Sequence, residues 1–192
     1  MRQGLALLFL LAPTYTEAQK LDDPQRFDRR LATCNGCHGR EGIPANPIRP
    51  IIFGQTAKYI DARIGDFRRG EGGDPEMTTL LSDLGRMDII KLSEWFAGKP
   101  WPDNGASPAG PEITEKAERL VARGDCVAGG CHDNRFTGGN VRVAGQHAEY
   151  LKHSLTRFRD KTRASPIMEG PAAELTDEDI TVLANYLAGL KS

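Results

Sequence analysis

The chain has 192 residues, a formal net charge of −1 and 39% hydrophobic residues, which suits one ordinary domain or two small ones. Lysines and arginines number 13 against 13 acidic residues over 19–105, and 11 against 12 over 106–192. Because neutralising phosphates requires a clustered basic surface, this balance argues against nucleic acid as a partner.

The N-terminus has the three-part layout of a secretory signal peptide over residues 1–18. Arg2 precedes an apolar run over 4–12, and we expect cleavage after Ala18. A membrane anchor is the alternative, but this run has about half of the roughly 20 apolar residues that a spanning helix needs. We therefore expect export to the periplasm, where the four cysteines must form disulfides or enter other covalent chemistry.

A short helix is expected over 24–33, because Asp23 can cap it and a proline suits its first position. Directly after it comes Cys34-x-x-Cys37-His38, the spacing for covalent attachment of haem c. Two thiols at i and i+3 can add to the two vinyl groups on one porphyrin edge, and the adjoining imidazole can bind the iron. A disulfide or half of a zinc site is the alternative, although zinc needs four ligands and a disulfide does not need the histidine.

The rest of the first half predicts two helices with a loop between them. Apolar residues at i, i+4 and i+7 from Ile60 predict a middle helix, and an apolar stripe from Ile89 to Phe96 predicts the last one. Met77, in a weakly periodic stretch between them, is the expected sixth iron ligand, because a thioether favours ferrous iron and suits electron transfer. Core filling is the usual role of a methionine. Met87 is a competitor, but it has the spacing of a helix residue.

A stretch rich in Pro and Gly over 100–111 is the expected linker between a first domain, 19–99, and a second domain, 112–192. These two halves repeat at a constant shift of 91 residues, which indicates duplicated domains. No segment shows a convincing alternation of apolar and polar residues, which is typical of strands. The predicted fold class is therefore all-α for both domains. The matched pairs include Gly54 with Gly145, Gln55 with Gln146, Tyr59 with Tyr150, Phe67 with Phe158, Met77 with Met168 and Leu92 with Leu183.

The second half repeats this plan with a helix expected over 112–123, followed by a longer motif, Cys126-x4-Cys131-His132. Two glycines inside the motif make the loop flexible enough to bring both thiols to one porphyrin edge. A lone disulfide, a zinc pair, or attachment through Cys131 alone are the alternatives. Met168, in register with the first methionine, is the expected sixth ligand.

Iron-bound histidines generally donate their other ring nitrogen to an acceptor, often a backbone carbonyl. We expect Pro50 to supply this carbonyl to His38, and Val141 to supply it to His132 without the rigidity of proline. Two further histidines lack counterparts in the first half and are expected on the surface, namely His147 and His153.

Together these residues resemble the periplasmic two-domain, dihaem cytochromes c of the cytochrome c4 type. The likeness covers nearly all of the mature chain and rests on Cys34-x-x-Cys37-His38, the stretches 144–151 and 158–159, Met168, and the stretch 175–186. The resemblance implies tandem class I cytochrome c domains, each wrapped around one covalent haem c. It also implies His/Met ligation in both halves, and haem propionates that face one another near the domain interface.

On this basis we expect an electron carrier, not an enzyme, that passes single electrons in a respiratory chain. Its expected partners are a terminal oxidase, a dehydrogenase or a small electron carrier, with peripheral association at the membrane. An alternative is the electron-accepting dihaem subunit of a periplasmic dehydrogenase that oxidises sulfide or thiosulfate. A third is a dihaem enzyme, but Met77 and Met168 would block the open iron position of a peroxidase, and only a detached Cys126 could supply a ligand thiolate.

Overall fold

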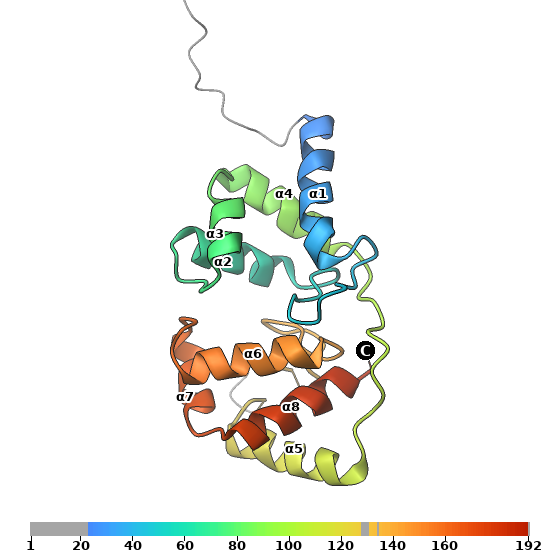
Figure 1. The fold of residues 1–192 in the computed structure, drawn as a ribbon, viewed down its shortest axis with the longest axis vertical. Helices are drawn as coiled ribbons and strands as arrows, with labels where there is room; N and C mark the ends of the chain where they lie inside the picture. Colours follow the sequence, from blue (N-terminus) through green and yellow to red (C-terminus); the bar gives the residue numbers. More distant parts are fainter. Residues whose placement is uncertain (1–22, 128–130, 134, 192) are drawn as a thin grey trace, which may run out of the picture.

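The computed structural model describes residues 23–127, 131–133 and 135–191, which form eight α-helices and no strand. Helices α1 to α4 make one bundle and α5 to α8 a second, and α2 and α6 lie on either side of the boundary between them (Figure 1). The expected signal peptide, residues 1–18, lies outside the described part. None of the described helices is both long and apolar enough to cross a membrane. The helices are α1 (Pro24–His38), α2 (Ala57–Arg68), α3 (Pro75–Leu81), α4 (Arg86–Ala97), α5 (Pro111–Arg123), α6 (Ala148–Arg159), α7 (Pro166–Ala173) and α8 (Asp177–Gly189).

Helix α1 is longer than expected, because it continues past residue 33 to His38. The Asp23 carboxylate caps its start by accepting a hydrogen bond from the backbone N–H of Gln25 at 2.9 Å. The helix stops at Gly39, whose φ of +88° only glycine adopts easily, and where a Cβ would lie 2.2 Å from the Ile43 carbonyl oxygen. The whole first cysteine motif therefore lies in the final turns of α1.

Two short helices stand where loops were expected, and they carry the candidate methionines. Met77 lies on α3 and Met168 on α7. The Asp74 carboxylate accepts from the N–H of Met77 at 3.1 Å, the Ser165 hydroxyl accepts from the N–H of Met168 at 3.4 Å, and each helix starts with proline. A side-chain cap and a proline at the first position favour a helix even when it is too short to display an apolar period.

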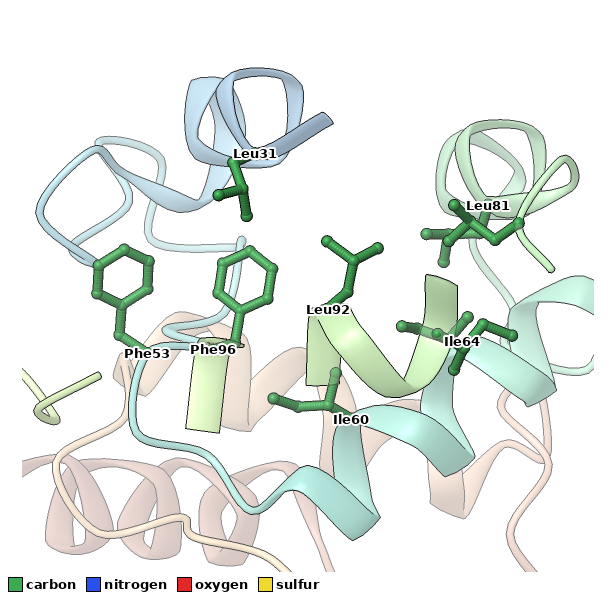
Figure 2. Close-up of a cluster of buried hydrophobic side chains, with 9 residues drawn as sticks. Leu31, Phe53, Ile60, Ile64, Leu81, Leu92 and Phe96 are labelled. Carbon is green, nitrogen blue, oxygen red and sulfur yellow. The ribbon is translucent and has the colours of Figure 1, made fainter. Parts of the chain in front are cut away.

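The core of the first half is built by all four of its helices. The stripe expected from Ile60 is confirmed, since Ile60 and Ile64 of α2 are buried and Phe67 packs against them. They meet Leu92 of α4 in the cluster that Figure 2 shows. The buried members of this cluster are Leu31, Phe53, Ile60, Ile64, Leu81, Leu84, Ile89, Leu92 and Phe96.

In the second half, α6 packs against α7 and α8, and α5 packs against α8. Helix α8 begins with a reciprocal cap, in which the Thr176 hydroxyl accepts from the N–H of Asp179 at 3.1 Å and the Asp179 carboxylate accepts from the N–H of Thr176 at 3.2 Å. Burial acts to raise the pKa of Asp179, but these hydrogen bonds and Arg123 outweigh it and lower the pKa. The carboxylate is therefore the stabilised form.

The segment between α4 and α5 runs alongside both halves and places Trp101 against a matched pair of glycines (Figure 1). The N–H of Gly54 donates to the Phe96 carbonyl and that of Gly145 to the Leu187 carbonyl, each at 2.9 Å. A Cβ on Gly54 would lie 2.7 Å from the backbone nitrogen of Trp101. A Cβ on Gly145 would lie 3.0 Å from the indole nitrogen of Trp101. Both glycines have positive φ, so larger residues would be strained there as well as crowded.

Candidate functional site

The structure brings all four candidate residues of the first half to one cavity. Cys34, Cys37 and His38 reach it from α1, and Met77 reaches it from α3. Much of the remaining wall in this half is apolar, and it includes Ile60, Ile64, Phe67, Leu81, Leu92 and Phe96. Two thiols, an imidazole and a thioether around an apolar space match the attachment and axial ligands of a haem.

His38 is oriented for metal binding by its own backbone surroundings. Its Nδ1 lies 2.9 Å from the Pro50 carbonyl oxygen, which confirms the expected acceptor. Because a carbonyl can only accept, Nδ1 carries the proton and Nε2 remains for a metal. Burial lowers the pKa of His38, although the Pro50 carbonyl acts in the opposite direction. The ring is therefore neutral, as a metal ligand must be.

The alternatives for the cysteines find no support in the described part of the chain. No disulfide joins Cys34, Cys37, Cys126 or Cys131 in the described part of the chain. The described residues contain no group of three or more His, Cys, Asp or Glu side chains placed to hold a metal ion, whereas zinc needs four N or S ligands. Burial raises the pKa of the Cys34 thiol, which favours its protonated form.

The second motif is arranged differently, because it follows α5 instead of forming its last turn. Burial lowers the pKa of His132. The nearby Val141 carbonyl acts in the opposite direction. That carbonyl is not a bonded acceptor, since the buried Nδ1 of His132 has no hydrogen-bond partner among the described residues. Residues 128–130, with the two glycines of the expected flexible loop, lie outside the described part. Grouping of Cys126, Cys131 and His132 with Met168 stays a prediction.

Two glutamines that the repeat had matched hold the halves together, a role that the pattern did not reveal. Gln146 accepts from the N–H of Ile51 and donates to its carbonyl, both at 2.9 Å. Gln55 makes the same pair of hydrogen bonds with Arg142, both at 2.8 Å. Positions 51 and 142 are themselves 91 residues apart, so the contact is reciprocal.

The first-half cavity continues across the boundary to a polar cluster that sequence reasoning missed. Arg163, only 5% exposed, donates to the Tyr59 hydroxyl at 2.9 Å, the Ser154 hydroxyl at 3.0 Å and the Tyr150 hydroxyl at 3.4 Å. All four residues line the cavity. The one available signal was a break in the repeat, because Gly72 stands where the register would place a counterpart of Arg163.

The structure also places the three remaining candidates, Met87, His147 and His153. Met87 lies on α4 and is 68% exposed, so it cannot reach the cavity from that position. His153 is exposed, as expected, at the rim of the cavity. The expectation that His147 lies on the surface is wrong, since it is half-buried at the start of α6 and its Nε2 is enclosed. Burial lowers its pKa, against the effect of the nearby Pro44 carbonyl.

No protein-family profile matches the chain. It is 31% identical to the cytochrome c4 of Thiocapsa roseopersicina over 187 residues, which cover 90% of this chain and 95% of that protein. The crystal structure of reduced recombinant cytochrome c4 from Pseudomonas stutzeri superposes with a TM-score of 0.73 at 28% identity, over 88% of this chain and 99% of that one. The thiosulfate dehydrogenase electron acceptor of Stutzerimonas stutzeri is 26% identical over 96% of this chain and 91% of that protein.

Proposed function

The chain belongs to the cytochrome c4 family, and on that premise we propose the roles of its residues and partners. It is a dihaem electron-transfer cytochrome built of two class I cytochrome c domains, with one covalent haem c in each. When bound, the haem iron supplies one-electron redox chemistry. The domains are proposed to span 19–99 and 112–192, joined by a linker over 100–111. These boundaries lie close to the end of α4 at Ala97 and within one residue of the start of α5 at Pro111.

The observation that carries the first site is that one cavity gathers every residue type it needs. Cys34 and Cys37 are proposed to form the two thioethers, and His38 and Met77 to be the axial ligands. The Pro50 carbonyl fixes the ring of His38 by accepting its Nδ1 proton. With a haem bound, the apolar walls would exclude water from the iron and favour its less charged ferrous state.

For the second site we propose Cys126 and Cys131 as thioether residues, with His132 and Met168 as axial ligands. The register of the repeat supports this assignment. Met168 sits in the first turn of a capped, proline-started helix, as Met77 does, and both lie nine residues before the start of the last helix of their half.

The protein is proposed to work in the periplasm, exported by residues 1–18, as an electron carrier and not an enzyme. Candidate partners are a terminal oxidase, a dehydrogenase or a small electron carrier, met in weak and fast encounters that typically bury less than about 1,200 Å². Peripheral contact with the membrane surface would bring it to an oxidase embedded there.

A second candidate function is that of an electron-accepting partner of a thiosulfate-oxidising dehydrogenase. The similarity to a thiosulfate dehydrogenase electron acceptor over most of both chains favours it. Gel filtration of the protein from its native host separates the two functions. A stable hetero-oligomer would support the dehydrogenase partner, and a monomer would support the free carrier.

Intact-mass analysis of protein matured with a cytochrome c assembly system tests the haem assignment. We expect the mass of two haems to be added, and a colourless product would refute the proposal. The Cys126→Ala variant then examines the long motif. If both cysteines form thioethers, the variant changes the reduced pyridine spectrum. If Cys131 alone is attached to the haem, the spectrum stays the same. That result would exclude Cys126 as a thioether residue.

A further inference from the structure

We propose that Arg163 of the second half binds a propionate carboxylate of the first-half haem and thereby raises the reduction potential of that haem. The proposal rests on the proposed function, because it needs a haem in the cavity lined by His38 and Met77. Arg163 lines this same cavity, although it comes from the loop between α6 and α7.

Contacts within the protein fix the position of the Arg163 guanidinium. It lies over the Phe158 ring, 4.4 Å from the centroid, and donates to the hydroxyls of Tyr59 and Ser154 at 2.9 and 3.0 Å. Tyr59 belongs to α2 of the first half, so the two halves together fix this cation. A charged group whose position is fixed loses little entropy when it binds a carboxylate.

One nitrogen atom of this buried cation makes no hydrogen bond to the described residues. The Nε of Arg163 is enclosed and has no hydrogen-bond partner among the described residues. Arg163 also takes part in none of the ion pairs found in that part of the chain. Buried charges are nearly always paired, and a guanidinium with a free N–H favours a carboxylate. A haem propionate is the carboxylate that the proposed function brings to this cavity.

The charges around the cavity favour the same occupant. Among the described residues that line the cavity, Asp74 is the only acidic one, against six arginines. Three of these arginines already pair with carboxylates from outside the lining, whereas Arg163 does not. Burial lowers the pKa of the Arg63 guanidinium, and repulsion from Arg163 adds to this effect. The six arginines are Arg30, Arg49, Arg63, Arg142, Arg157 and Arg163.

The repeat places Gly72 in register with Arg163, so the first half has no arginine at the matching position. A fixed positive charge near a haem disfavours the ferric state, which carries one more positive charge than the ferrous state. A first-haem propionate bound to Arg163 would therefore raise the reduction potential of that haem.

The test measures the two potentials in the matured Arg163→Gln variant by spectroelectrochemical titration, with haem signals assigned by NMR contacts to first-half side chains such as Ile60. One unit charge about 10 Å away changes the equilibrium by roughly tenfold at an effective dielectric constant of about 20. At a fixed applied potential we expect the ferrous-to-ferric ratio of the first haem to fall about tenfold, or about 59 mV. Arg163→Lys keeps the charge and should retain most of the ratio. Arg119→Gln, which removes an exposed arginine paired with Glu115, is the control.

A change in the first haem no larger than in the Arg119→Gln control would overturn the proposal, and so would an equal or larger change in the second haem. If Arg163→Gln does not mature, a crystal structure of the loaded protein decides. A first-haem propionate within hydrogen-bond distance of Nε supports the proposal, and its absence overturns it. Because intact mass reports haem attachment separately, failure here is distinguishable from failure of the proposed function.

Discussion

Replacing Gln146 by alanine is expected to loosen the contact between the halves. The side chain is 3% exposed and satisfies both the N–H and the carbonyl of Ile51, each at 2.9 Å. Ile51 is only 1% exposed, so water cannot readily take the place of the lost amide. Leaving a buried polar group unsatisfied costs about 1–3 kcal/mol, and two such groups give about 2–6 kcal/mol for Gln146→Ala.

Gln55→Ala is the matched control, because Gln55 makes the same two hydrogen bonds to Arg142. These bonds are only partly buried, so water can replace part of what is lost. We expect about 1–2 kcal/mol for this variant.

Urea unfolding of the matured proteins measures both costs, with haem absorbance and tryptophan fluorescence as probes. Gln146→Ala should shift the midpoint to lower urea and separate the transitions of the halves, since multidomain proteins lose two-state behaviour when their contact weakens. A cost for Gln55→Ala equal to or above that for Gln146→Ala would refute the reasoning. So would a cost for Gln146→Ala below about 0.5 kcal/mol, the range of neutral surface substitutions.

Met77→Ala and Met168→Ala should each remove the low-spin signal of one haem and lower the potential of that site, because a thioether ligand favours ferrous iron. If a variant keeps both potentials in a redox titration, the methionine that it replaces is not an iron ligand. Asp179→Asn should lower the stability of the second half near neutral pH, since the pKa of Asp179 is lowered in the folded chain and its carboxylate stabilises the fold above the unfolded pKa of 3.8. That contribution disappears as the pH falls through the lower folded pKa, so urea midpoints of the two proteins should converge at acid pH, and a constant difference would contradict the assignment.

Local chemistry made much of the first site predictable. The spacing of Cys34, Cys37 and His38 follows from the dimensions of a porphyrin edge, and the Pro50 acceptor follows from the needs of a metal-bound imidazole. The middle helices were predictable from their apolar period. Helices α3 and α7 were missed because seven or eight residues are too few to show a period. The pairs Asp74-Pro75 and Ser165-Pro166 were the available signals, a capping residue followed by proline.

What joins the halves was not predictable from one sequence. The repeat marked Gln55 and Gln146 as matched, but a glutamine amide can serve any neighbouring backbone, and its partner lies 87 or 95 residues away. Arg163 was harder still, because it breaks the repeat and its role depends on Tyr59, 104 residues distant. Periodicity reports contacts within a helix or its immediate neighbours, and it says nothing of partners brought close only by docking.

The reciprocal glutamine contact means that each half carries both a glutamine amide and the backbone that such an amide recognises. A surface of this kind is self-complementary, as in an isologous dimer with two-fold symmetry. A single ancestral domain with this surface would have associated with its own copy before duplication fused the two. Covalent linkage then raised the effective concentration of one copy near the other, so the contact no longer needed to be strong enough to hold separate chains together. Features that break the symmetry, such as Arg163 in register with Gly72, reflect divergence of the two copies after duplication.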